Sequence, residues 1–171
     1  TTASAGFPGQ CASESASIKG CGESPSPAPV SRKWSSNGWS SGWSASPGGL
    51  VRALLPMLRQ SGGTWVGWTG EHDDAAEPFD VDGVHLHPVS LSSEDVELYY
   101  EGFSNDALWP LYHDALREST YSIEQWDAYH AVNERFALSL AEIAPEGLVV
   151  WIHDYQLQLV PGLLRAQRPD L

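Results

Sequence analysis

The chain is organised around residues 148–161, which read Leu148-Val149-Val150-Trp151-Ile152-His153-Asp154-Tyr155-Gln156-Leu157-Gln158-Leu159-Val160-Pro161. The run begins with five apolar residues that do not alternate with polar ones, which predicts a strand buried on both faces of a parallel sheet. Ligands of open α/β sheets bind beyond the carboxyl ends of the strands, and Asp154 is expected there. The same spacing also fits an N-cap for the following helix, and both roles stay open.

Strand and helix patterns alternate over residues 46–171, which predicts an α/β fold around a parallel sheet. We expect strands at 64–68 and 83–89, an acidic loop at 69–78, a turn at 102–105, and helices at about 50–60, 92–101, 107–113, 122–143 and 157–167. Ser92 with Asp95, and Ser122 with Gln125, have the spacing of capping boxes. The helix at 122–143 has one apolar stripe, formed by Ile123, Trp126, Tyr129, Val132, Phe136, Leu140 and Ile143.

Residues 1–45 differ from the rest of the chain because Ser, Gly, Pro and Ala dominate them. No strand or helix pattern precedes Trp34, so we expect this stretch to be disordered or loosely packed. Trp34, Trp39 and Trp43 could form a binding platform, although a linker folded back onto the domain fits them better. The prediction is a low-complexity start at 1–45 and one domain at 46–171.

The net charge, the cysteines and the hydropathy of the chain argue against several classes of protein. A formal net charge of -13 argues against nucleic acid or an anionic membrane as partner, because both need a basic face. Cys11 and Cys21 have the spacing of neither a metal site nor a disulfide framework. A membrane span needs about 20 consecutive apolar residues, and no run in the chain approaches that length. Residues 1–30 lack the hydrophobic h-region of a signal peptide. We therefore expect a cytoplasmic protein.

Three groups of residues are candidates for binding. Gly48 and Gly49 open a helix and could bring backbone N–H groups close to a phosphate, although a plain turn is the more frequent explanation of two glycines. Tyr100 and Trp109 could offer a hydroxyl and a flat apolar face to a sugar, or could be ordinary core aromatics. His85 and His87 would share one face of a strand, but no third metal ligand is evident, so we predict no metal.

Five segments together closely resemble the trehalose-6-phosphate synthase family. They are Ser-Pro-Gly-Gly-Leu-Val at 46–51, Gly-Thr-Trp-Val-Gly-Trp at 63–68, Tyr-Tyr-Glu-Gly-Phe-Ser-Asn-Asp-Ala-Leu-Trp-Pro-Leu-Tyr-His at 99–113, Trp-Asp-Ala-Tyr-His-Ala-Val-Asn-Glu-Arg-Phe-Ala at 126–137 and Val-Trp-Ile-His-Asp-Tyr-Gln-Leu-Gln-Leu-Val-Pro at 150–161. The resemblance implies a Rossmann-like N-terminal domain of a two-domain GT-B glycosyltransferase. It also implies glucose transfer from UDP-glucose to glucose 6-phosphate with retention of configuration, and no cofactor.

The resemblance also implies roles for individual residues. Tyr100 and Asp154 would bind the acceptor, glucose 6-phosphate. Trp109 would line the acceptor pocket and help to select the anomer, and Trp68 would border the same pocket. Gly48 and Gly49 would approach the donor diphosphate. Retention in this family is usually explained by front-face attack, which requires no protein nucleophile, so positioning and charge stabilisation carry the catalysis.

Two departures from the family pattern predict an incomplete domain. The family opens with a strand that ends in Ser-Asn-Arg-Leu-Pro, whose Arg holds the acceptor phosphate, whereas residues 24–32 read Ser-Pro-Ser-Pro-Ala-Pro-Val-Ser-Arg. We therefore expect residues 1 to about 28 to be a non-native start. The family's next strand and its C-terminal domain have no counterpart before Leu171. We expect the isolated chain to be inactive and the full-length protein to be a homo-oligomer.

Two alternatives stay open at this point. A related glycosyltransferase with another acceptor, such as a glucosylglycerol-phosphate synthase or a pseudoglycosyltransferase, would share the same motifs. A non-catalytic fragment that binds sugar phosphates belongs to a different class. Saturable binding of glucose 6-phosphate without glucose transfer would favour that second class.

Overall fold

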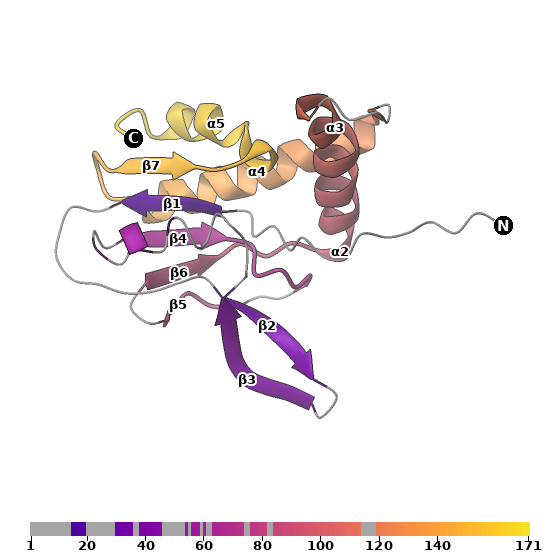
Figure 1. Cartoon of the computed structure of the whole chain (residues 1–171). Helices are drawn as coiled ribbons and strands as arrows, with labels where there is room; N and C mark the ends of the chain where they lie inside the picture. The colour runs from indigo at the N-terminus through magenta and orange to yellow at the C-terminus, as the bar shows by residue number, and fades with distance from the viewer. Residues whose placement is uncertain are drawn as a thin grey trace.

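The computed structural model describes the backbone of residues 15–19, 30–35 and 38–45, and both backbone and side chains of residues 54, 56–58, 60, 63–73, 76–81, 84–113 and 119–171. These residues form one mixed sheet, helices on both sides of it, and a separate hairpin (Figure 1). Residues Gly48 and Gly49 lie outside the described residues, so the predicted diphosphate contact has no structural counterpart here.

The sheet has the strand order β5-β6-β4-β1-β7. Its strands are β1 at Ser15–Lys19, β4 at Thr64–Gly67, β5 at Phe79–Val81, β6 at Val84–Pro88 and β7 at Val149–Ile152. β4 and β6 run parallel, and β1 is antiparallel to both β4 and β7, so β4, β6 and β7 all point the same way. β5 is antiparallel to β6. The α/β class is confirmed, but the sheet is mixed, and the expectation of a purely parallel sheet is wrong.

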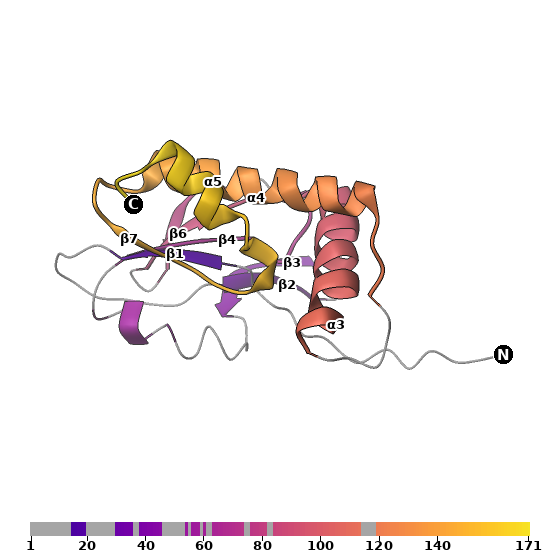
Figure 2. The same ribbon diagram turned by 90° about the horizontal axis from the view of Figure 1, so that it is seen from above.

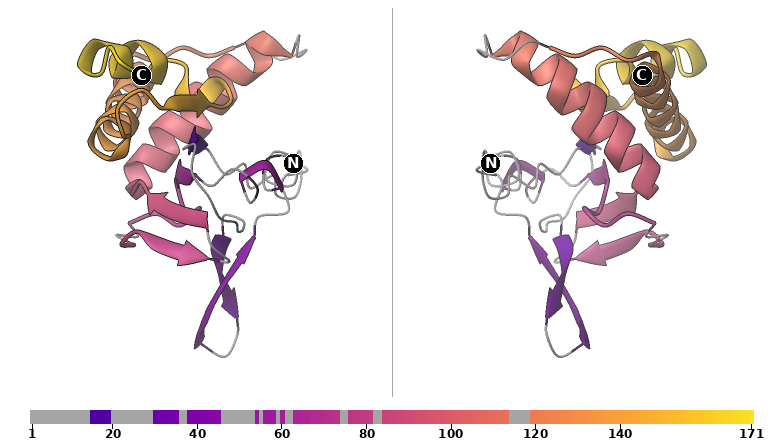
Figure 3. Two further views of the ribbon diagram at one scale, coloured as in Figure 1. Left: turned by 90° about the vertical axis from the view of Figure 1, so that its left-hand side faces the viewer. Right: turned by 90° about the vertical axis from the view of Figure 1, so that its right-hand side faces the viewer.

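Strands also occur where the sequence predicts none. β1 at Ser15–Lys19 pairs with the facing edges of β4 and β7, while β2 at Val30–Ser35 and β3 at Gly38–Ala45 form a hairpin. Figure 3 shows this hairpin projecting away from the sheet. The sequence shows no strand pattern before Trp34, whereas the structure places β1 and most of β2 there. These segments are rich in Ser and Gly and gain their strand structure from backbone pairing, which composition does not reveal.

The two faces of β4 enter different cores. Val66 belongs to the larger cluster, which also contains Tyr99, Phe103, Tyr129, Phe136, Leu140, Leu157 and Val160. Trp65, next in the chain and on the opposite face, packs with Leu54, Leu58, Val84 and Leu86. The strict change of face between neighbouring residues is the period-two pattern of a strand buried on both sides.

β7, the last strand of the described sheet, differs from the sequence expectation because the described residues cover only one of its faces. Val149 and Trp151 are 67% and 47% exposed, while Val150 and Ile152 pack against the larger core. One face of β7 is thus covered and the other faces solvent among the described residues. The prediction of burial on both faces is wrong, since an apolar run does not show whether a packed layer covers each face of the strand.

A single long helix extends from 93 to 112, where the sequence predicts two helices separated by a turn. It comprises α2 at Ser93–Asp95, the π-helix η1 at Val96–Leu108 and α3 at Trp109–Tyr112 (Figure 1). Gly102 is buried inside it, and a Cβ there would lie 2.7 Å from Nε2 of Gln125. The glycine therefore permits close approach of the next helix and forms no turn, so the predicted turn at 102–105 is wrong.

The capping box at the start of this helix is confirmed. The amide of Asp95 donates to Oγ of Ser92 over 3.0 Å, and the amide of Ser92 donates to Oδ2 of Asp95 over 2.8 Å. The second predicted box is wrong, because Ser122 makes no side-chain cap bond. Gln125, its expected partner, lies against Gly102 instead.

The longest helix, α4 at Ile123–Ile143, follows the predicted stripe over most of its length. Tyr129, Val132, Phe136 and Leu140 are buried, whereas Ile123 is 71% exposed. Figure 2 shows that α4 begins beyond the ends of the strands, beside η1. After β7 come a short 3₁₀ turn, η2 at Tyr155–Leu157, and α5 at Val160–Gln167 beside α4. Within the described residues, no helix has the length and apolar composition of a membrane span.

Candidate functional site

The predicted site residues lie on three elements of the described structure. Trp68 directly follows β4, and Asp154 follows β7 by two residues. Because β4 and β7 point the same way, their carboxyl ends lie at the same edge of the sheet. Tyr100 lies on η1 and Trp109 begins α3. Ligands of α/β sheets bind at this edge, so the topology supports the site that the sequence predicts.

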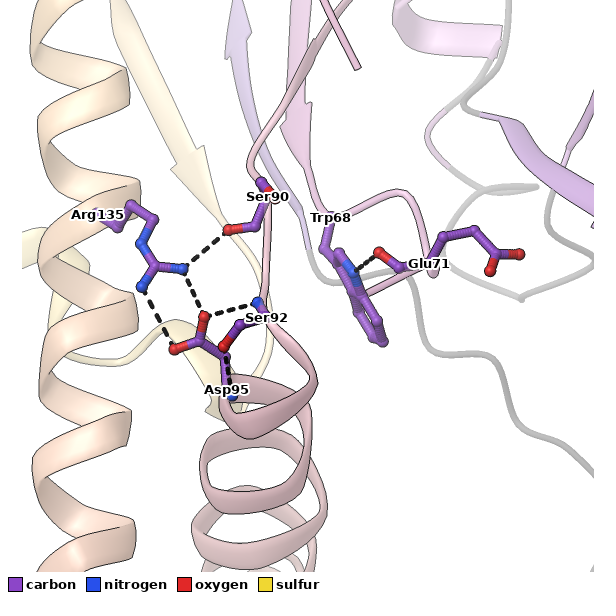
Figure 4. Close-up of polar contacts among 6 residues, drawn as sticks. All are labelled: Trp68, Glu71, Ser90, Ser92, Asp95 and Arg135. Carbon is purple, nitrogen blue, oxygen red and sulfur yellow. Dashed lines mark hydrogen bonds and ion pairs between the residues drawn. The ribbon is translucent and has the colours of Figure 1, made fainter. Parts of the chain in front are cut away.

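Trp68 and Tyr100 are in direct contact. Their ring centroids are 5.6 Å apart and their planes meet at 59°. The indole Nε1 of Trp68 donates to the backbone oxygen of Glu71 over 2.8 Å (Figure 4). This bond fixes the ring on the loop after β4, and the buried phenol of Tyr100 packs against it. The structure therefore brings these two predicted residues together.

The π-helix explains how Tyr100 and Trp109 can act on one side. Its i→i+5 hydrogen bonds give about 4.4 residues per turn, so a separation of nine residues corresponds to about two full turns. An α-helix has 3.6 residues per turn and would place them on nearly opposite sides. The amide of Trp109 donates to the oxygen of Ser104, five residues earlier, so the π pattern continues as far as this tryptophan.

Trp109 is joined to the loop after β7 by aromatic contacts. Its ring stacks on His113, with centroids 4.4 Å apart and planes at 19°. The edge of His113 faces Tyr155 at 6.5 Å, and the Tyr155 hydroxyl donates to Oδ1 of Asn105 over 3.0 Å. Asn105 is one π-turn after Tyr100. These contacts link the helix that carries Tyr100 and Trp109 to the loop that carries Asp154.

Asp154 itself has an unusual backbone conformation, with φ 71° and ψ 169°. Its Oδ1 accepts a hydrogen bond of 2.8 Å from the amide of Tyr155, so Asp154 does cap the 3₁₀ turn that follows. The residue is exposed, and this bond uses only one of its two carboxylate oxygens. The cap therefore leaves hydrogen-bonding capacity for a ligand.

His153 lies beside this carboxylate but is buried, with its ring 4.7 Å from that of Trp151. Burial lowers the pKa of His153, and the neighbouring Asp154 offsets part of that effect. Its Nε2 has no hydrogen-bond partner among the described residues, and neither do Oγ of Ser104 and Oε1 of Gln156. A neutral imidazole at this position keeps positive charge away from the carboxylate at neutral pH.

The sequence patterns assign no role to Asn105, His113 or Tyr155, although all three lie within segments 99–113 and 150–161, which resemble the family. Their contribution depends on the π-helical register, and a helix pattern in a sequence is normally interpreted with a 3.6-residue period. The contact between Asn105 and Tyr155 also joins residues 50 positions apart. No local signal in the sequence indicates such a contact.

The arginines whose side chains are described bind groups other than the predicted site residues. Arg135 binds Asp95 through two bonds of 2.8 and 3.3 Å and Ser90 through one of 2.8 Å (Figure 4). Arg165 donates to the oxygen of Pro169, and Arg168 donates to Asp170, Ala141 and Ala144. These are the arginines whose side chains the structure describes, and each is engaged in holding the fold.

The two histidines of β6 form a separate feature. Nδ1 of His85 lies 2.9 Å from Oδ1 of Asp80. The pKa of His87 is lowered by burial and by the neighbouring His85. Across the part of the chain that the structure describes, no three His, Cys, Asp or Glu residues are arranged to hold a metal ion.

Comparison with known proteins shows which proteins the chain resembles. Trehalose-6-phosphate synthase of Mycolicibacterium smegmatis is 57% identical over 129 residues, which cover 75% of this chain and 26% of that protein. The enzyme of Mycobacterium tuberculosis is 53% identical over 137 residues, covering 75% and 27%. This chain therefore spans about a quarter of the length of these relatives.

Solved structures show the same similarity. The synthase of Burkholderia xenovorans in complex with glucose-6-phosphate superimposes with a TM-score of 0.63 and 32% identity, over 70% of this chain and 27% of that one. The E. coli protein bound to UDP-2-fluoro glucose superimposes with a TM-score of 0.64 and 31% identity, over 75% and 29%. The profile of glycosyltransferase family 20 matches residues 23–171. The chain belongs to glycosyltransferase family 20, whose members among its relatives are trehalose-6-phosphate synthases.

Proposed function

We propose that this chain supplies the acceptor side of an α,α-trehalose-phosphate synthase. The full-length protein would transfer glucose from UDP-glucose to glucose 6-phosphate with retention of configuration. The observation that carries the proposal is the meeting of family motifs at one sheet edge, where Trp68 contacts Tyr100 and the loop of Asp154 is bonded to the same helix. The solved relatives, one with glucose-6-phosphate and one with a UDP-glucose analogue, support these substrates.

The proposed residue roles are those that the family resemblance implies, and the chemistry of the side chains fits them. Asp154 accepts hydrogen bonds from acceptor hydroxyls, and the Tyr100 hydroxyl binds the same sugar. Trp109 presents a partly exposed flat face, 39% accessible, to the C–H face of the pyranose and helps to select its anomer. Trp68 borders the pocket behind Tyr100. Gly48 and Gly49 approach the donor diphosphate through their backbone N–H groups.

No protein nucleophile is required in this mechanism. The acceptor hydroxyl attacks the anomeric carbon from the face on which the diphosphate departs, and a departing phosphate oxygen takes its proton. Asp154 then orients the acceptor and does not act as the base, so its effect comes through positioning. Charge on the leaving diphosphate and on the acceptor phosphate needs cations. Because the described arginines are engaged elsewhere, we infer that basic groups outside the described residues provide them.

The decisive experiment measures glucose transfer by a full-length protein that carries this chain. UDP-glucose is offered with glucose 6-phosphate, glucose or glycerol 3-phosphate, and the products are identified by mass spectrometry. Trehalose phosphate formed only with glucose 6-phosphate supports the proposal. Transfer to glycerol 3-phosphate would instead identify a relative with another acceptor, and binding of glucose 6-phosphate without transfer would identify a non-catalytic protein.

Two properties of the whole protein accompany this proposal. Both proposed substrates are anionic phosphorylated metabolites that do not cross membranes unaided, which supports a cytoplasmic location. A homo-oligomer is inferred by family resemblance, and light scattering of the full-length protein would test it.

A further inference from the structure

Asp154 adopts a backbone conformation that glycine accepts and other residues avoid. Its φ of 71° and ψ of 169° lie outside the regions open to side chains with a Cβ atom. Such a conformation persists only when the surrounding structure enforces it. The bond from the Tyr155 amide to Oδ1 of Asp154 is local and exposed, so it does not by itself account for this enforcement.

Two side chains of α4 bind the backbone that immediately follows Asp154. The hydroxyl of Tyr129 donates to the oxygen of Tyr155 over 2.7 Å and accepts from the amide of Gln158 over 3.3 Å. Nδ2 of Asn133 donates to the oxygen of Gln156 over 3.0 Å, and Oδ1 of Asn133 accepts from the amide of Leu159 over 3.1 Å. Four backbone groups within five residues are thus held by one helix.

Both side chains have little freedom to move. Asn133 is 0% exposed and Tyr129 is 1% exposed, so each is fixed by the core around α4. Nδ2 of Asn133 also donates to the oxygen of Tyr129, over 2.8 Å, which couples the two positions. The Tyr129 ring packs on Phe103 at 4.8 Å and on Tyr99 at 5.7 Å, and both belong to the helix that carries Tyr100.

We propose that Tyr129 and Asn133 are positioning residues that hold Asp154 in its strained conformation and thereby aim its carboxylate at the acceptor. They touch no ligand and act through the backbone of 155–159. The ligand part of this inference rests on the proposed function. The conformational part does not, and it is tested separately.

The first test compares glycine and alanine at position 154. Both lack the carboxylate, and only alanine has the Cβ atom that makes this backbone conformation unfavourable. In the otherwise unchanged chain, we expect Asp154→Gly to have a folding equilibrium constant at least threefold larger than Asp154→Ala. In a Tyr129→Phe background the loop can relax, so the ratio should fall to one or below, because alanine is ordinarily the more favourable residue. Urea unfolding gives these constants, and Asn133→Asp repeats the test from the other side chain.

The second test measures glucose 6-phosphate binding by calorimetry in the full-length protein that carries this chain. Tyr129→Phe should weaken binding at least fivefold, whereas Leu140→Val, a core change on the same helix, should leave it unchanged even where it costs as much stability. The proposal is overturned if the folding equilibrium constant of Asp154→Gly is smaller than that of Asp154→Ala in the chain without further substitutions. It is also overturned if Tyr129→Phe and Asn133→Asp leave the ratio of these two constants unchanged. If the unchanged chain binds no glucose 6-phosphate, the acceptor role fails while the ratio still decides the conformational role.

Discussion

Arg168 shows how one residue can join three parts of the chain. Its Nη1 donates to the oxygens of Ala141 and Ala144 over 2.8 Å each, which satisfies carbonyls at the end of α4. Its Nε and Nη2 bind the two carboxylate oxygens of Asp170 over 2.9 and 2.7 Å. Oδ2 of Asp170 also accepts from the amide of Gly147 in the turn before β7. The end of α4, the turn that follows it and the end of α5 therefore form one bonded unit.

This unit predicts a loss of stability in strong acid. The hydrogen bonds from Arg168 lower the pKa of Asp170 to about 2. A lowered pKa means that the unfolded chain binds the proton more readily, so stability from this group is present above its unfolded pKa and is lost as pH falls towards 2. Urea midpoints measured between pH 5 and pH 2 should fall less steeply for Asp170→Asn than for the unchanged chain. Equal slopes would remove Asp170 from the acid response.

The second prediction at this scale concerns the carboxylate of Asp154. In a full-length enzyme we expect Asp154→Ala to reduce turnover at least about tenfold, as expected when one charge-assisted hydrogen bond to the acceptor is lost. Steady-state kinetics with both substrates varied will measure this. Asp170→Asn, which alters a distant carboxylate, is the control. Unchanged constants for Asp154→Ala would exclude this residue from the acceptor site.

At the scale of elements, the π-helix is the feature on which the proposed acceptor site depends. Deleting Asp106 shortens the path from Tyr100 to Trp109 by one residue and turns Trp109 by about 80° around the helix axis, since one π residue covers that angle. We expect helical circular dichroism to be retained and glucose 6-phosphate binding to be lost. Asp106→Ala removes the same side chain without a change of register and should bind normally. Normal binding by the deletion variant would show that the alignment does not matter.

The start of the same helix is held to α4 by Arg135. Burial raises the pKa of Asp95, but hydrogen bonds from Arg135 and Ser92 outweigh that effect and hold the pKa below its usual value. Arg135→Gln should lower the free energy of unfolding by about 1 kcal/mol, since it removes partly exposed charge-assisted bonds. Arg165→Gln removes an exposed bond to Pro169 and should cost less than about 0.5 kcal/mol. Urea unfolding distinguishes the two, and equal losses would contradict the role of Arg135.

For the whole molecule, the excess of negative charge predicts a response to salt. With 22 acidic and nine basic residues, the folded chain brings like charges together and is destabilised by their repulsion. Raising NaCl from about 0.02 M to about 0.3 M shortens the screening length and should raise the thermal midpoint. KCl at equal ionic strength should have the same effect, because screening does not depend on the cation. A midpoint that falls or stays constant would show that attractive pairs outweigh the repulsion.

The sequence predicts most of the helices and strands, but it does not predict all of the ways in which they pair and pack. The strands β4 and β6, the helix α4 and the Ser92 cap follow from local patterns, and the structure confirms them to within one residue at each end that it describes. Local patterns cannot show that β7 ends the described sheet, that Gly102 admits Gln125 or that β1 pairs between β4 and β7, because each depends on a partner far along the chain. The residues of the candidate site were found by resemblance, and their alignment depends on a helical period that sequence patterns do not reveal.

The backbone conformation of Asp154 also determines which amino-acid replacements at position 154 are compatible with the fold. A single base change converts an aspartate codon into one for glycine, the residue that this combination of φ and ψ suits best. At φ 71° and ψ 169°, selection for folding alone would permit this replacement and would even favour it. An aspartate retained at position 154 among descendants of this gene would therefore record selection on the carboxylate, separately from selection on the fold.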